Sequence, residues 1–170
     1  MKKTLFKPML VALVMLFVAS VASVNAQDYA SKMKLWGENM IDFNFLLDKA
    51  IEAQKHSYAP YSKYNVGSAL LTKGGNVYTG CNIENSSYGA TICAERSAFA
   101  SAISAGEHDF SAIAIVGGAD FSHAEKAFPC GICLQVMSEH CDKDFQIILT
   151  ENGKTRTFRL DELLPNGFKL

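Results

Sequence analysis

Hydrophobic residues recur along the chain first at helical spacing and then at strand spacing. From Phe43 onward they lie three and four residues apart, as in an amphipathic helix, until a proline-containing segment at Tyr58–Tyr61 interrupts the pattern. Short apolar runs predict strands at 66–72, 77–81, 111–116, 145–150 and 155–160. Further helices are predicted at 92–105 and 130–140, with a short helical turn at 161–164.

This order of elements predicts an α/β fold. One helix precedes a hairpin of two strands, and the later helices alternate with the remaining strands. Because both faces of such a sheet need to be covered, we expect a three-layer α/β/α sandwich with a single mixed sheet of about five strands. The domain is expected to span residues 43–170 and to follow a polar, loosely ordered segment at 27–42.

The first 26 residues have the layout of a secretory signal peptide. Basic residues precede an unbroken run of 11 apolar residues, Met9–Ala19, and Val24 and Ala26 suit the −3 and −1 positions of a cleavage site. Eleven residues are too few to cross a bilayer, which takes about 20. We expect cleavage after Ala26, export to the periplasm or the exterior, and no stable membrane association afterwards. An uncleaved N-terminal anchor is the alternative.

Removing this leader changes the charge of the protein. The whole chain has 16 basic and 17 acidic residues, but Lys2, Lys3 and Lys7 lie in the leader. The remaining 144 residues, enough for one domain with a core, carry 13 basic and 17 acidic residues and a net charge of −4. Nucleic-acid binding generally depends on a basic face that displaces counterions from phosphates. The composition therefore argues against a nucleic-acid partner.

Three of the five cysteines have the spacing of a metal site. Cys130 and Cys133 form a Cys-x-x-Cys after Pro129 at the start of one predicted helix, and Cys93 opens another. Free N–H groups and the helix dipole stabilise thiolates at helix N-termini. Two helices that meet at these ends can hold one zinc ion with three thiolates. The fourth tetrahedral position then stays open for water, as in catalytic zinc sites.

Glu95 and Arg96 suggest the chemistry of this site. Zinc deaminases carry a ligand-x-Glu segment followed by Pro-Cys-x-x-Cys, and here that segment is Cys93-Ala94-Glu95. Glu95 is expected to take a proton from the attacking water and to deliver protons to N3 of a pyrimidine and to the leaving amine. Three thiolates give the zinc site a net charge of −1, which hydrogen bonds from Arg96 would offset. The alternative for Arg96 is a solvated helix residue.

Five motifs together resemble the small homotetrameric cytidine deaminases, over roughly residues 43–168. They are Ala59-Pro60-Tyr61-Ser62-Lys63, Gly80-Cys81-Asn82-Ile83-Glu84-Asn85, Cys93-Ala94-Glu95-Arg96, Pro129-Cys130-Gly131 with Cys133, and Glu162-Leu163-Leu164-Pro165. The resemblance implies a cytidine deaminase-like fold, one zinc ion per subunit, and a homotetramer with shared active sites. It also implies hydrolysis of cytidine and 2′-deoxycytidine to uridine and 2′-deoxyuridine, with release of ammonia.

The resemblance also implies substrate contacts. Asn82 and Glu84 match residues that bind the ribose hydroxyls, and their amide and carboxylate groups suit vicinal hydroxyls. The backbone N–H of Ala94 is expected to hold the pyrimidine. Phe168 matches a C-terminal aromatic residue that reaches the site of a neighbouring subunit; a surface residue on a frayed tail is the alternative.

Two positions depart from the family pattern. Tyr64 stands where the family commonly has a phenylalanine beside the nucleoside, so its added hydroxyl needs a partner. Leu134 replaces the arginine that usually follows the last ligand cysteine, which would leave Arg96 alone to support the thiolates.

Other interpretations use the same residues. A deaminase of another aminopyrimidine, such as a cytosine-containing antibiotic, would keep the zinc site, although the segment 82–85 and Arg96 favour an ordinary ribonucleoside. A nucleic-acid deaminase fits less well, because the mature charge is negative and histidine is the commoner first ligand there. A structural zinc site closed by His140 or Cys141 would leave Glu95 without a role.

The remaining candidates are expected to be structural. Cys81 and Cys141 are predicted to be buried thiols rather than a disulfide formed after export. Trp36 and Phe43 are expected to cover the core. The four histidines lack metal spacing relative to Cys93 and are expected to be mostly exposed; they are His56, His108, His123 and His140.

Overall fold

The computed structural model describes residues 42–122, 126–151 and 153–169, in a compact unit that begins at Asp42. The predicted signal peptide, all but the last residue of the predicted loose segment, Trp36 and His123 lie outside the described residues. The elements are α3 (Phe43–Gln54), β1 (Tyr64–Thr72), β2 (Val77–Cys81), η1 (Tyr88–Ala90), α4 (Ala94–Ser104), β3 (Phe110–Ala119), α5 (Gly131–His140), β4 (Gln146–Glu151), β5 (Lys154–Arg159) and α6 (Leu160–Leu163). Within this described part of the chain, no helix is both long and apolar enough to span a membrane.

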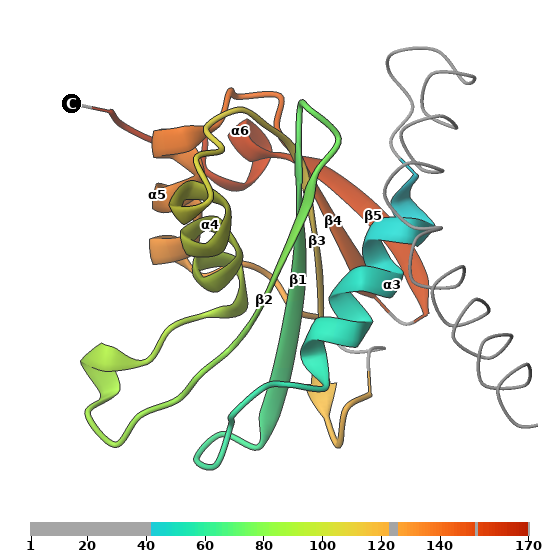
Figure 1. The fold of residues 1–170 in the computed structure, drawn as a ribbon, viewed down its shortest axis with the longest axis vertical. Helices are drawn as coiled ribbons and strands as arrows, with labels where there is room; N and C mark the ends of the chain where they lie inside the picture. Colours follow the sequence, from blue (N-terminus) through green and yellow to red (C-terminus); the bar gives the residue numbers. More distant parts are fainter. Residues whose placement is uncertain (1–41, 123–125, 152, 170) are drawn as a thin grey trace, which may run out of the picture. The chain divides into compact units, whose positions relative to one another are not determined.

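The five strands form one mixed sheet in the order β2-β1-β3-β4-β5. β3 pairs parallel with β4, and the other neighbouring pairs are antiparallel. Figure 1 shows α3 on one side of the sheet and α4 and α5 on the other. The predicted three-layer α/β/α sandwich with about five strands is confirmed.

Successive residues of β1 face opposite layers, and glycines allow both layers to come close. A Cβ atom at Gly67 would lie 2.1 Å from the carbonyl oxygen of Ala50 in α3. On the other face, the Ser68 hydroxyl donates to the carbonyl of Ala94 at 2.8 Å. A Cβ at Gly80 in β2 would lie 2.4 Å from that same carbonyl oxygen. Only glycine permits this approach, which fixes the first turn of α4 against the sheet.

Several element boundaries differ from the predictions by a few residues, and two of these differences have a clear local reason. α4 begins at Ala94 rather than at residue 92, because Ile92 forms a β-bridge with Ile83. β3 continues to Ala119 through Gly117 and Gly118, which were expected to end it, because both pair with β1. Close packing explains why a glycine occupies position 117, since a Cβ at Gly117 would lie 2.8 Å from the Cβ of Ala127.

The predictions for the other cysteines and the described histidines are confirmed except at Cys81. All five cysteines are free thiols; Cys141 is buried, but Cys81 is only partly buried, contrary to the prediction. Burial raises the pKa of Cys81, and raises that of Cys141 to about 12. Phe43 is partly buried, and the three histidines among the described residues are exposed: His56, His108 and His140.

Candidate active site

Three cysteine sulfurs meet where the N-terminal ends of two helices converge. Cys93 and Cys130 are the N-cap residues of α4 and α5, and Cys133 lies in the first turn of α5. The Sγ atoms of Cys93 and Cys130 are 3.9 Å apart, those of Cys130 and Cys133 are 3.6 Å apart, and all three lie within 4.8 Å of one another. A tetrahedral zinc ion with Zn–S bonds of about 2.3 Å requires sulfurs roughly 3.8 Å apart. The thiol cluster therefore fits one Zn²⁺ per subunit.

The surroundings of the sulfurs favour a thiolate at Cys93. A hydrogen bond from Cys133 lowers the pKa of Cys93 to about 5, with Arg96 and Cys130 adding to the effect against the opposing effect of burial. The same hydrogen bond, with burial, raises the pKa of Cys133. In the metal-free site Cys133 therefore stays protonated and donates a hydrogen bond to the Cys93 thiolate. Metal binding releases that proton, so zinc affinity rises with pH.

A closed four-ligand zinc site is ruled out by the position of the candidate fourth ligands. His140 and Cys141 lie at the C-terminal end of α5, about 10 to 12 Å along the axis from Cys133 at 1.5 Å per residue. The His140 ring stacks on Phe99, with ring centroids 6.0 Å apart. Among the described residues, the ligand cluster consists of three thiols, so zinc bound by them would keep a coordination position for water.

Glu95 is the buried acid of the site. Its residue surface is only 4% exposed, on the first turn of α4 beside Cys93. Burial raises the pKa of Glu95 to about 7, and the nearby charge of Cys93 adds to the increase. A carboxyl group with a pKa near neutrality can both accept and donate a proton at physiological pH.

Arg96 turns toward the sulfurs rather than toward solvent. Its Nη2 donates to the Thr91 carbonyl at 3.0 Å and to the Cys93 sulfur at 3.8 Å. Burial lowers the pKa of Arg96, but the Cys93 hydrogen bond and the charges of Cys93 and Cys133 raise it overall. The Nε atom is buried and has no hydrogen-bond partner among the described residues. These contacts support the expected position of Arg96 beside the thiolates over that of a solvated helix residue.

A pocket opens beside the thiolates and Glu95. The predicted site residues that line it are Tyr64, Asn82, Glu84, Cys93, Ala94, Glu95 and Cys130. Ala94 is the first residue of α4, so its N–H has no partner within the helix. The pocket thus combines an acid, a cation site and free backbone donors.

Asn82 and Glu84 are held by backbone groups at the pocket edge. Asn82 accepts from the Val66 N–H and donates to the Tyr64 carbonyl, both at 2.9 Å. Glu84 Oε2 accepts from the N–H groups of Tyr61 at 2.9 Å and Ser62 at 3.2 Å. Burial acts to raise the pKa of Glu84, but a hydrogen bond from the Ser62 side chain and the two backbone bonds lower it overall. Each side chain keeps further hydrogen-bonding capacity for a ligand.

Phe168 and Leu134 lie outside the pocket lining. Phe168 is 63% exposed, and its carbonyl accepts from Gln135 of α5 at 3.0 Å. Leu134 is buried in the hydrophobic core. With Leu134 in the core, Arg96 is the guanidinium that contacts the thiolates within the described residues.

Other pocket residues carry no motif and were not predicted. They are Val66, Thr91, Ile92, Ile115, Lys126, Ala127 and Phe128. The last three come just before Pro129-Cys130, so proximity to the ligand motif was their one signal in the sequence.

The chain matches the family model described as the cytidine and deoxycytidylate deaminase zinc-binding region, over residues 40–149. It belongs to this deaminase family. Cytidine deaminase of Halalkalibacterium halodurans is 45% identical over 129 residues, covering 75% of this chain and 95% of the relative. Cytidine deaminase of Mycobacterium tuberculosis is 40% identical over 130 residues, covering 76% and 92% respectively.

A solved structure shares the deaminase fold. The crystal structure of cytidine deaminase from Burkholderia pseudomallei has 42% identity and a TM-score of 0.68, and the match covers 76% of this chain and all of that one. A more distant relative, blasticidin-S deaminase of Bacillus cereus, is 32% identical over 108 residues, covering 61% of this chain and 76% of the relative.

Glu95 gives the zinc-free deaminase a pH-dependent stability. Because the pKa of Glu95 is about 7 in the folded state and 4.5 ordinarily, its ionisation destabilises the folded state progressively as pH rises from about 4.5 to 7. Glu95→Gln should therefore raise the free energy of unfolding at pH 8 by up to about 3 kcal/mol and change it little at pH 4.5. Urea unfolding of zinc-stripped, reduced protein at both pH values measures this. Glu139→Gln, at an exposed position on α5, is the control, and an equal effect of Glu95→Gln at both pH values would contradict the assignment.

Proposed function

We propose that this deaminase hydrolyses cytidine and 2′-deoxycytidine to uridine and 2′-deoxyuridine with release of ammonia. The observation that carries the proposal is the convergence of three cysteine sulfurs with tetrahedral spacing and a buried glutamate on one pocket. Zinc, when bound by Cys93, Cys130 and Cys133, polarises a water molecule and lowers its pKa.

Glu95 moves the protons of this reaction. Its ionised carboxylate takes a proton from the attacking water and delivers it to N3 of the pyrimidine, which makes C4 more electrophilic. A second proton from the water passes through Glu95 to the amino group, which leaves as ammonia. The raised pKa of Glu95 supports this double role, because the group is neither permanently ionised nor permanently protonated near pH 7.

Arg96 and the pocket edge complete the proposed site. Arg96 withdraws charge from the thiolates, so that the zinc ion keeps its ability to polarise water. Asn82 and Glu84 bind the ribose hydroxyls, Ala94 N–H holds the pyrimidine ring, and Tyr64 packs beside the nucleoside. The hydrogen bonds that fix the Asn82 and Glu84 side chains support this assignment, since preformed contacts bind with less loss of entropy.

Turnover of cytidine tests the proposed function. Residues 27–170, loaded with zinc, are incubated with cytidine, 2′-deoxycytidine, cytosine and a cytosine-containing antibiotic nucleoside, and the loss of aminopyrimidine absorbance is followed. We expect the two nucleosides to be the best substrates. The similarity to blasticidin-S deaminase favours the antibiotic as the second candidate, and a higher kcat/KM for it would replace our proposal. If the zinc-loaded protein turned over none of these four compounds, the proposed deaminase activity would be refuted.

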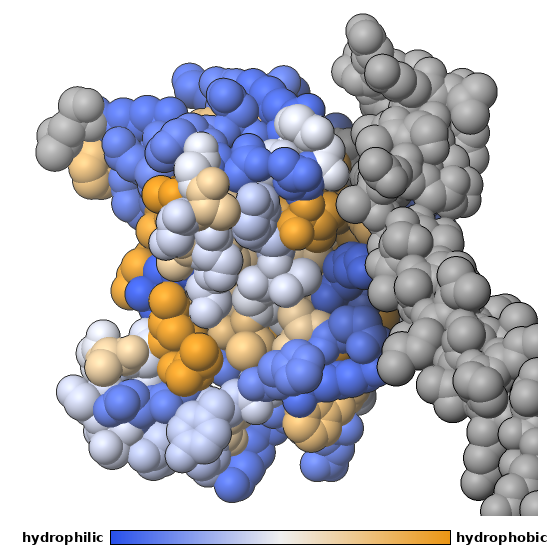
Figure 2. All heavy atoms as spheres, in the orientation of Figure 1, coloured by the Kyte–Doolittle hydropathy of each residue, from blue (hydrophilic) through white to orange (hydrophobic). Residues whose placement is uncertain are grey.

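We also propose a homotetramer with shared active sites. Several large hydrophobic side chains are exposed: Phe128 at the pocket, Ile132 on α5, and Tyr61, Tyr88 and Phe168 elsewhere on the described part of the chain. Figure 2 shows hydrophobic surface along the side of the molecule where α5 lies. Analytical ultracentrifugation of residues 27–170 should give the mass of four subunits, and Phe168→Ala should raise the KM for cytidine if that ring reaches a neighbouring site. A monomer with full activity would refute both statements.

Export of the protein is a separate proposal, supported by the leader-like sequence of residues 1–26. Mass spectrometry of the native protein should find an N-terminus at Gln27. An intact Met1 would refute cleavage.

A further inference from the structure

One wall of the pocket is a short segment that carries neither a metal ligand nor a family motif. This wall segment, Lys126–Phe128, lines the pocket together with Tyr64 and ends two residues before the ligand Cys130. Its middle residue, Ala127, is buried and packs closely against Gly117. A Cβ atom added at Gly117 would lie only 2.8 Å from the Cβ of Ala127. Its outer residues contact strands that contribute nothing to the zinc site.

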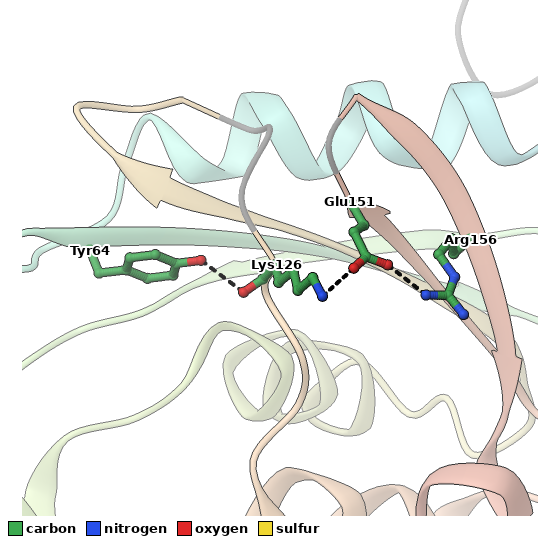
Figure 3. Close-up of polar contacts among 4 residues, drawn as sticks. All are labelled: Tyr64, Lys126, Glu151 and Arg156. Carbon is green, nitrogen blue, oxygen red and sulfur yellow. Dashed lines mark hydrogen bonds and ion pairs between the residues drawn. The ribbon is translucent and has the colours of Figure 1, made fainter.

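A carboxylate on β4 binds one end of the wall segment. The two oxygens of Glu151 are divided between two cations: Oε1 pairs with the Lys126 ammonium, and Oε2 accepts from Arg156 Nη1 of β5 at 2.6 Å (Figure 3). The Glu151 side chain is only 13% exposed, although both cations are more than half exposed. The two cations lower the pKa of Glu151, which therefore stays ionised in the physiological range.

The other end of the wall segment is held by an aromatic ring on β5. Phe128 packs on Phe158 of β5 with ring centroids 5.4 Å apart, and the Arg156 guanidinium lies 4.8 Å from the centroid of the Phe158 ring. The two ends of the wall segment are therefore linked by a continuous series of contacts. It runs from Lys126 through Glu151, Arg156 and Phe158 to Phe128. A third attachment comes from β1, where the Tyr64 hydroxyl donates to the Lys126 carbonyl at 3.0 Å (Figure 3).

We propose that Glu151, Arg156 and Phe158 are positioning residues for substrate: the β4–β5 strand pair clamps the wall segment and thereby sets the shape of the nucleoside pocket. The inference rests on the proposed function, because the wall matters only if the pocket binds substrate. A single exposed ion pair contributes little. Here contacts fix both ends and the centre of a three-residue segment, so loss of the anchor at one end should loosen that end and make the pocket wall less well defined.

Kinetics of two variants test the clamp. Glu151→Gln removes the charge that joins the two cations, and Arg156→Met removes both the ion pair and the contact with Phe158. We expect each to raise the KM for cytidine about fivefold, with kcat within about twofold and zinc unchanged at one per subunit. The wall segment lines the pocket without contributing a zinc ligand, so we expect it to contact the substrate alike in the ground and transition states and its loss to weaken binding without slowing the chemistry. The double variant should raise KM further than either single variant but by less than the product of the two single effects, because the groups share one network of contacts.

A matched control lies on the same strand. Arg159 of β5 is an exposed arginine paired with Asp161 rather than with the wall segment, so Arg159→Met should leave KM unchanged. A KM within about 1.5-fold of wild type for both test variants, an equal rise in Arg159→Met, or loss of zinc from the test variants would overturn the clamp.

Hydrogen–deuterium exchange provides a readout that does not depend on turnover. Exchange of the backbone amides in a peptide covering residues 126–130 should become faster in Glu151→Gln and Arg156→Met and stay unchanged in Arg159→Met. A wild-type protein that does not deaminate cytidine refutes the proposed function, and exchange still decides the clamp. Unchanged exchange in both test variants refutes the clamp even in an active deaminase.

Discussion

Replacing Glu95 with glutamine should lower kcat for cytidine by about ten-thousandfold while zinc stays bound at one per subunit. Glutamine keeps the shape of the side chain and can still donate a hydrogen bond, but it cannot take a proton from water. Positioned acid–base groups contribute up to about 10⁴-fold to rates, equivalent to roughly 5 kcal/mol of transition-state stabilisation. Glu95 is buried at the end of the pocket that holds the thiolates, and no second carboxyl among the described residues lines the pocket except Glu84, which is bonded to backbone N–H groups.

Steady-state kinetics and zinc analysis on the same samples check this expectation. The KM of the variant should remain within a fewfold of wild type, because the lost interaction acts in the transition state. Glu139→Gln, at an exposed position on α5, should keep full activity. A Glu95→Gln variant that retains a tenth of the wild-type kcat would show that another group moves the protons.

The metal site is predictable from the sequence because its chemistry restricts the residue types. The sequence places Cys93 before Glu95 at one helix start, and Cys130 and Cys133 after Pro129 at another. This combination predicts the three cysteines as ligands, since few other arrangements place three soft ligands around one ion. The fold follows from the same kind of constraint. Alternating apolar runs predict the five strands and the helices that cover them.

The remainder of the pocket depends on sheet order, which local patterns do not encode. Lys126 and Glu151 are 25 positions apart in the sequence, and the wall segment meets β4 and β5 only through the arrangement of the sheet. The start of α4 at Ala94 was missed for a similar reason, since the bridge between Ile83 and Ile92 overrides the helical preference of the preceding residues. Tyr64 was only partly predictable. The sequence indicated that its hydroxyl needs a hydrogen-bond partner, and the structure shows that this partner is the Lys126 carbonyl.

Replacing the ligand Cys133 with alanine should abolish both zinc binding and activity. Replacing Cys141, the buried cysteine at the other end of α5, should abolish neither. Cys133 and Cys141 are similarly buried, but Cys133 belongs to the metal cluster and Cys141 follows the C-terminal end of α5. Cys133→Ala leaves two sulfurs, too few to hold zinc against dilution, so we expect less than about 0.1 zinc per subunit and kcat at least about 10³-fold lower.

The contrast with Cys141→Ala separates loss of metal from loss of packing. Both substitutions remove a buried sulfur, so both are expected to lower the free energy of unfolding of the zinc-free protein by similar amounts, on the order of 1–2 kcal/mol. Only Cys133→Ala should also lose the stabilisation that bound zinc adds, about 4 kcal/mol when free zinc is 1,000 times the dissociation constant. Urea unfolding with and without zinc, under reductant so that neighbouring sulfurs do not oxidise, measures both quantities. If zinc stabilised the Cys133→Ala variant as much as the wild type, the ion would be held elsewhere, and the three-thiolate site and the mechanism that depends on it would both be wrong.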